Sequence, residues 1–123
     1  MPSPSVRPDP RSFLPLTPLA FQVLLALAGE ARHGYGIILD VSERTGGRVR
    51  LRTGALYTAI GRLASLGLIR ETSRVDDTDA RRRFYALTPA GRMALRLETA
   101  RLEARVEQAR SKGVRPVSLK AKS

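Results

Sequence analysis

The apolar residues of the chain recur at intervals that predict four helices and one β-hairpin. In the first helix, Thr17 can serve as the capping residue and Pro18 takes the first helical position. This helix is expected to reach about Ala28, and its sequence LAFQVLLALA is apolar on nearly every side, as in a central buried helix. A second helix follows GEARHG and ends at Gly46-Gly47, with one buried stripe made of Ile37, Ile38 and Val41.

The third predicted helix starts at Thr53, which can cap it, and runs to about Leu66 before Gly67. Ahead of it, RVRL alternates apolar and basic residues and is interpreted as a short strand or an extended turn. The core-facing positions follow helical spacing and are Leu56, Ile60 and Leu63. The opposite face then carries Thr53, Ala55, Thr58 and Arg62, flanked by Gly54 and Tyr57.

The segments LIRET and RFYAL predict two strands of a hairpin, joined by the long polar segment SRVDDTDARR. Phe84 and Tyr85 point to opposite faces of such a strand, so one is expected in the core and the other partly exposed. Thr88 and Pro89 open a last helix that reaches about Arg110. A mainly α chain with this element order and one small hairpin is typical of a winged helix-turn-helix domain.

This order divides the chain into four parts. Residues 1–12 hold four of the eight prolines and are expected to form a disordered arm. Residues 13–88 form the winged-helix domain, residues 89–110 an added C-terminal helix, and residues 111–123 a disordered basic tail. Both ends can touch phosphates, although solvated flexible tails are the more common explanation.

The charge of the chain indicates which kind of partner it binds. The net charge is +11, from 22 Lys and Arg against 11 Asp and Glu, and such a balance favours polyanions, most often nucleic acid. No acidic residue lies between Glu43 and Glu71. The arginines of this acid-free zone are Arg44, Arg48, Arg50, Arg52, Arg62 and Arg70.

The third helix lies inside this basic zone. A helix that enters the major groove of DNA brings its first turn close to base edges, and Gly54 and Ala55 remove bulk there. Arg52 and Arg62 can supply charge beside it. The alternative is an amphipathic helix whose polar face meets only water, but this leaves the small neutral first turn unexplained.

Several classes of function are not expected. With no cysteine and a single histidine, the chain offers no disulfide, no metal site and no cofactor site. No catalytic triad or phosphate-binding loop is present, so an enzyme is not expected. His33 is expected to cap or pack between helices rather than to sense pH or a ligand. No apolar run is long enough to span a membrane, and the absence of a signal segment favours a cytoplasmic protein.

The chain resembles the PadR family of bacterial transcription regulators. The matching segments are LTP at 16–18, HGYGI at 33–37, TGALYTAIGRLASLGLI at 53–69 and RRRFYALTPAGR at 81–92. The resemblance covers about residues 14–110 and implies a winged-helix homodimer that represses promoters. By position, Tyr57 falls on the family's recognition-helix tyrosine and Tyr35 on the tyrosine that opens the second helix.

The resemblance also places Arg81, Arg82 and Arg83 on the basic strand of the wing. These arginines either contact the DNA backbone or form a solvated hairpin edge. Tyr35 either contacts a phosphate or fills the gap between the second and third helices. The chain departs from the family at Thr58, where many relatives have proline, and in the hairpin loop, where phosphates would repel Asp76, Asp77 and Asp79.

The last helix carries an apolar stripe composed of Leu95, Leu102, Val106 and Ala109. A second copy of the chain can cover this stripe by coiled-coil-like pairing; alternatively, the helix folds back on the first helix of its own chain.

The sequence therefore predicts a sequence-specific regulator of double-stranded DNA, a repressor that binds an inverted repeat as a homodimer. The alternatives are a winged-helix adaptor for other proteins and a nonspecific nucleoid-associated protein. A small-molecule effector is possible, and the sequence does not identify it.

Overall fold

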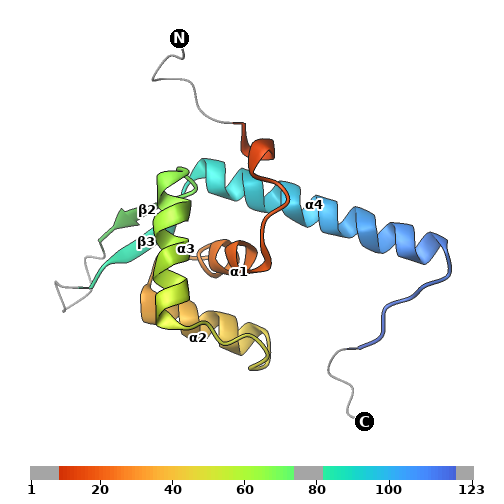
Figure 1. Cartoon of the computed structure of the whole chain (residues 1–123), viewed down its shortest axis with the longest axis horizontal. Helices are drawn as coiled ribbons and strands as arrows, with labels where there is room; N and C mark the ends of the chain where they lie inside the picture. The colour runs from red at the N-terminus through yellow and green to blue at the C-terminus, as the bar shows by residue number, and fades with distance from the viewer. Residues whose placement is uncertain (1–8, 74–81, 119–123) are drawn as a thin grey trace.

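The computed structural model describes residues 9–73 and 82–118. The elements in chain order are the 3₁₀ helix η1 (Pro10–Phe13), α1 (Pro18–Ala26), β1 (Arg32–His33), α2 (Gly34–Arg44), α3 (Thr53–Ser65), β2 (Ile69–Thr72), β3 (Phe84–Leu87) and α4 (Pro89–Ser111). Figure 1 shows α1 surrounded by α2, α3 and α4, with the sheet at one side and α4 projecting away from the other elements. Within the described ranges, no helix is long and apolar enough to cross a membrane.

Helix α1 forms the centre of the core, as its sequence predicts. It contacts α2, α3 and α4, and Val23 and Leu24 are fully buried. Its start is confirmed, because the Thr17 hydroxyl accepts a hydrogen bond from the Ala20 N–H at 3.0 Å. Its end comes two residues earlier than the predicted Ala28, since the last turn tightens to i→i−3 hydrogen bonds.

Helix α3 buries the three predicted residues Leu56, Ile60 and Leu63. It stops before Gly67, whose φ of 78° lies in the left-handed region that glycine adopts at helix ends. The prediction that Thr53 caps this helix is wrong. Thr53 is the first helical residue, and Arg52 takes the cap position without a side-chain hydrogen bond.

The sheet has three antiparallel strands in the order β1-β3-β2. Strands β2 and β3 confirm the predicted hairpin, whereas β1 was not predicted; the segment RVRL forms no strand. Because β1 pairs with the outer edge of β3, both Phe84 and Tyr85 are buried, so the expected partial exposure of one of them is wrong. Tyr85 joins the main core, and the Phe84 and His33 rings pack in a T-shaped arrangement with their centroids 5.2 Å apart.

The predicted arm and tail lie partly outside the described residues. Residues 1–8 and 119–123 lie outside the described ranges, and so do residues 74–81 of the hairpin loop. The expectation of disorder is wrong for residues 10–12, because Pro10–Phe13 form η1 and contact α4. The side chain of Asp9 caps η1 by accepting a hydrogen bond from the Arg11 N–H.

The end of α3 and the start of α4 meet at one junction. Thr88 caps α4, as predicted, by accepting a hydrogen bond from the Gly91 N–H at 3.0 Å. The Thr88 hydroxyl also donates to the Gly67 carbonyl at 2.6 Å, and the backbone N–H of Thr88 donates to the Leu68 carbonyl at 3.1 Å. Gly91 is required here, since a β-carbon would overlap the Leu68 carbonyl oxygen.

A buried ion pair fixes the segment before α1 onto α4. Glu98 is only 2% exposed, and it accepts hydrogen bonds from the Arg101 guanidinium at 2.8 and 2.6 Å and from the Leu16 N–H at 3.3 Å. The Arg101 hydrogen bond, and secondarily the Leu16 N–H, hold the pKa of Glu98 below its ordinary value. The charged form of Glu98 therefore stabilises the folded chain.

We expect Glu98→Gln to lower the free energy of unfolding by about 1–2 kcal/mol at neutral pH, because Arg101 loses its charged acceptor while Leu16 keeps a carbonyl oxygen. Since the pKa of Glu98 is lowered on folding, its contribution is full above the unfolded value of about 4.3 and is lost as the pH falls through the folded value. The free energies of unfolding of wild type and variant, measured by denaturant melts, should therefore become equal in acid. The exposed Glu103→Gln serves as control, and equal stability of all three proteins at pH 7 would contradict this role.

Candidate nucleic-acid interface

The outermost line of α3 consists of small side chains. Gly54, Thr58, Gly61 and Ser65 follow each other at intervals of four, three and four residues, so they lie on one line opposite the buried residues of the helix. All four are exposed, and a β-carbon at either glycine would meet no atom within 4 Å. Another molecule can therefore approach the backbone of α3 closely. Gly61 and Ser65 were not predicted, although the same helical spacing could have identified them.

The other α3 residues predicted to bind DNA are also exposed. Arg52 and Thr53 lie at the open N-terminus of the helix. Ala55 and Arg62 lie on the flank that faces the start of α1, while Tyr57 lies on the opposite flank. The guanidinium of Arg62 has no hydrogen-bond or ion-pair partner within residues 9–73 and 82–118. The cation is therefore available to a ligand.

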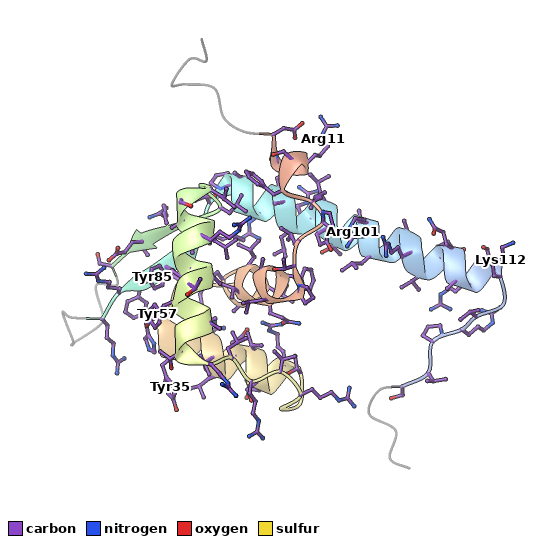
Figure 2. All side chains as sticks on the ribbon, viewed as in Figure 1. Arg11, Tyr35, Tyr57, Tyr85, Arg101 and Lys112 are labelled. Atoms are coloured by element: carbon purple, nitrogen blue, oxygen red, sulfur yellow. The ribbon has the colours of Figure 1, made fainter. Side chains whose placement is uncertain are left out.

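On the Tyr57 side, the fold forms a polar recess of about 480 Å³. Its lining brings together three segments that are far apart in the sequence: His33, Gly34, Tyr35, Tyr57, Arg82, Arg83 and Tyr85. Four of the predicted DNA-binding residues thus share one site, and Figure 2 shows the three tyrosines on the same side of the molecule. Arg81 falls outside the described residues, as do Asp76, Asp77 and Asp79.

The end of the Tyr57 side chain, and not Tyr35, lies over the first residue of α2. Tyr35 is 64% exposed, so its interpretation as a gap-filling residue is wrong. The hydroxyl of Tyr57 lies directly over Gly34, where a β-carbon would overlap it. A glycine at this position therefore leaves room for the Tyr57 hydroxyl in the recess.

His33 links the recess to the N-terminus of α2. Its Nδ1 accepts a hydrogen bond from the Gly36 N–H at 3.1 Å, which confirms that it caps and packs. Because Nδ1 is the acceptor, a neutral ring carries its hydrogen on Nε2. This nitrogen is 3.3 Å from Nη1 of Arg82, which is also a donor. An anion beside this pair of nitrogens can accept a hydrogen bond from each of them.

Further groups of the recess strengthen this preference for an anion. The pKa of Tyr85 is raised, chiefly by burial and additionally by the neighbouring Tyr57 and Glu71, so its hydroxyl remains a donor at neutral pH. The first N–H groups of α2 add the positive end of a helix dipole. Arg83 forms a solvent-exposed ion pair with Glu71 at 3.7 Å, which contributes little energy. The arrangement suits a phosphate oxygen.

The predicted apolar stripe of α4 divides into two parts. Leu95 is only 6% exposed and belongs to the core of its own chain, so its assignment to a dimer interface is wrong. The physical reason is that the first half of α4 packs on α1, η1 and β3. Leu102 and Val106 are 38% and 45% exposed, and Ala109 is half-buried. The second half of the stripe therefore remains available to a partner.

Known structures share this architecture. A PadR family transcription regulator from Clostridium difficile is 24% identical, with a TM-score of 0.66, and the match covers 76% of this chain and 95% of that chain. The hsRosR-S4 complex of the Halobacterium salinarum protein RosR is 30% identical, with a TM-score of 0.62 and coverage of 81% and 80%. Bacillus subtilis PadR in complex with operator DNA is 20% identical, with a TM-score of 0.56, and the match covers 89% of this chain and 55% of that longer one.

No curated protein matches the chain significantly. The model of the transcriptional regulator PadR-like family matches residues 23–97, which run from the buried part of α1 through the first turns of α4 and are more than half of the chain. This span contains α2, α3, the sheet and the recess between them. The three-stranded sheet beside α3 is the wing of a winged helix-turn-helix fold. The chain belongs to the PadR-like family of transcriptional regulators.

Proposed function

We propose that this chain is a homodimeric repressor that recognises an inverted repeat in double-stranded DNA. The observation that carries the proposal is that the exposed line of small residues on α3, from Gly54 to Ser65, lies beside the donor-lined recess. A groove-reading helix and a phosphate site must lie next to each other on a DNA-binding surface, because phosphates border every groove. The related operator complex of Bacillus subtilis PadR supports this interpretation.

Each part of the surface has a distinct role in this proposal. The line from Gly54 to Ser65 lets the α3 backbone lie close to base edges in the major groove. Arg52 and Arg62 neutralise phosphates or read guanine at its two sides. The recess holds one backbone phosphate between Tyr57, Tyr35 and Arg82, which fixes the register of the helix on the duplex.

The dimer interface in this proposal is the exposed half of α4. Leu102 and Val106 are apolar and open, and Leu102 also borders a groove of about 440 Å³ between α1 and α4. The same helix of a second copy can cover both surfaces around a two-fold axis. Two-fold symmetry then requires half-sites about 34 Å apart along the duplex.

Gly61→Glu tests whether α3 faces DNA. We expect it to abolish binding, because the carboxylate would stand on the outer line of α3 near phosphates. The fold should be retained or stabilised by about 0.5 kcal/mol, since glutamate is a better helix former and the position is open. Gel shifts with DNA from upstream of the chain's own gene, and with its scrambled sequence, should be paired with circular-dichroism melts.

The matched control is Gly61→Ala, which adds one methyl group and should keep binding. Undiminished affinity of a folded Gly61→Glu variant would place the DNA elsewhere. Equal binding of upstream and scrambled DNA by the wild type would indicate a nonspecific nucleoid protein, and binding of neither would favour the adaptor.

Gly34→Ala tests the recess. The new methyl group should displace the Tyr57 hydroxyl at small cost to stability, because the overlapping atoms are the end of a side chain. Affinity should fall by about 1 kcal/mol for every DNA sequence, since a phosphate contact carries no sequence information. Fluorescence anisotropy with upstream and scrambled duplexes at low salt measures both affinities.

Gly36→Ala is the control on the same helix, because its β-carbon would make only ordinary contacts at 3.6 Å and beyond. If displacement of the Tyr57 hydroxyl is the cause, Gly34→Ala should add nothing to Tyr57→Phe. Additive losses would show that the two residues act independently and that the recess is not organised as proposed.

Replacing both Leu102 and Val106 by glutamate tests the dimer. Carboxylates buried without partners are costly, so light scattering should report a monomer or an unfolded chain. Gln108→Glu, on the exposed side of α4 away from the stripe, should leave the dimer intact. Footprinting of the wild type should protect two symmetric half-sites. A wild-type monomer at micromolar concentration, or protection of one asymmetric half-site, would be evidence against the dimeric proposal.

A further inference from the structure

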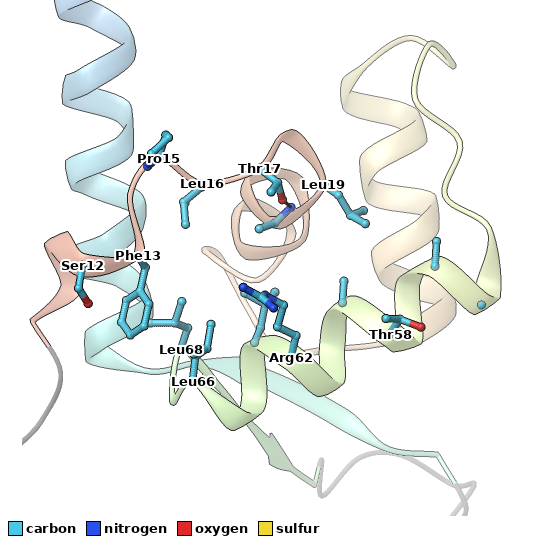
Figure 3. A pocket seen from close by; sticks show the side chains of 15 residues that line it. Ser12, Phe13, Pro15, Leu16, Thr17, Leu19, Thr58, Arg62, Leu66 and Leu68 are labelled. Carbon is cyan, nitrogen blue, oxygen red and sulfur yellow. Dashed lines mark hydrogen bonds between the residues drawn. The ribbon is translucent and has the colours of Figure 1, made fainter.

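A second, apolar pocket lies on the opposite flank of α3 from the recess. It measures about 540 Å³, is open to solvent on one side, and lies between the segment from Ser12 to Ala20 and α3 with the residues that follow it. Figure 3 shows η1 and the start of α1 above α3, with the side chains of both sides directed into the space between them. Its volume is within the range of about 300–1,000 Å³ of pockets that bind small molecules.

The walls of this pocket are hydrocarbon. Phe13, Leu16 and Leu19 come from the N-terminal segment, and Leu63, Leu66 and Leu68 come from the end of α3 and the residues after it. The space between them exists because the facing residues are small: Ala20, Ala55 and Ala59. The core side chains Leu63 and Leu68 form its base and are buried, so the pocket has a fixed floor.

Arg62 is the one charged residue among those that line the pocket. In Figure 3 its side chain extends from α3 across the pocket toward the start of α1. Across the two described ranges its guanidinium has no partner. Thr17 and Thr58 also line the pocket, and the Thr17 hydroxyl is the cap of α1. A guanidinium beside hydrocarbon walls matches a ligand with one carboxylate and an apolar body.

We propose that this pocket binds a small monocarboxylic acid with an apolar body, of the chemical class of a medium-chain fatty acid, and that Arg62 holds the carboxylate. The apolar body lies between Phe13, Leu19 and Leu66. A neutral alcohol of the same length leaves the guanidinium without an acceptor, and a short acid leaves the hydrocarbon walls uncovered.

This site gives the ligand a route to regulation, which rests on the proposed function. Arg62 and Ala55 belong both to the pocket and to the predicted DNA-facing side of α3. A carboxylate on Arg62 removes one cation from the phosphates, and an acid in the pocket adds bulk beside the first turns of the helix. Ligand and DNA therefore compete, and each weakens the binding of the other by the same factor.

Calorimetric titration of the full chain without DNA tests the site directly. The probes are octanoate, 1-octanol and acetate. Octanoate should bind with one site per chain, whereas octanol and acetate should bind at least about tenfold more weakly. Arg62→Met, which keeps the side-chain stem, should weaken octanoate binding about tenfold. Ala59→Leu, which fills the space, should abolish it.

The control is Arg96→Met, an exposed arginine on α4 outside this pocket, and it should bind octanoate like the wild type. Thermal melts show that each variant is folded. Octanoate binding that survives both Arg62→Met and Ala59→Leu would overturn the proposal, because the acid would then occupy another surface such as the α4 groove. Absence of octanoate binding would overturn it as well.

A gel shift at constant ionic strength tests the regulatory part. Saturating octanoate should weaken the affinity of the wild type for upstream DNA about tenfold, and acetate should not. DNA binding without octanoate tests the proposed function separately, since the calorimetric result does not depend on it. Octanoate that binds at Arg62 and leaves DNA affinity unchanged would overturn the competition.

Discussion

The close contact of Gly91 with the Leu68 carbonyl sets the relation between the three parts of the structure that the proposed function needs. It brings the first turn of α4 against the residue where α3 has ended and β2 begins. The Thr88 side chain and backbone add hydrogen bonds to Gly67 and Leu68 at the same place. Helix α3, the wing and α4 thus meet at one closely packed junction, so the direction of α4 and the direction of α3 depend on each other.

Much of the fold could be predicted from local signals. The Thr-Pro pairs at 17–18 and 88–89 located two helix starts, and the spacing of Leu56, Ile60 and Leu63 oriented α3. The failures that concern the sheet and the buried charge share one physical cause, which is contact between segments that are distant in the sequence. A two-residue strand such as β1 has no periodicity of its own, and it exists because β3 offers a free edge. Glu98 resembles a surface residue of a helix until Leu16 and Arg101 cover it.

The candidate site also divides into a part that local sequence patterns predict and a part that depends on contacts between distant segments. Its α3 part could be predicted, because small residues and arginines on one helix face form a local pattern. The recess could not be assembled from sequence, since residues 33–35, 57 and 82–85 meet only after folding. The role of Gly34 is visible only in the contact with Tyr57. Leu95 is an error of another kind. The stripe on α4 is regular in the sequence, but Leu95 packs in the chain's own core and only the later residues of the stripe are exposed.

The small outer line of α3 also has a thermodynamic consequence. Each of its two glycines lowers helix propensity by about 1 kcal/mol relative to alanine, and a helix of 13 residues is marginal by itself in water. The helicity of this segment therefore derives from its three buried side chains rather than from its own sequence. Any substitution that loosens the central core lowers the population of molecules in which α3 is helical. The proposed contact of α3 with DNA therefore depends on core residues that lie far from the exposed face of this helix.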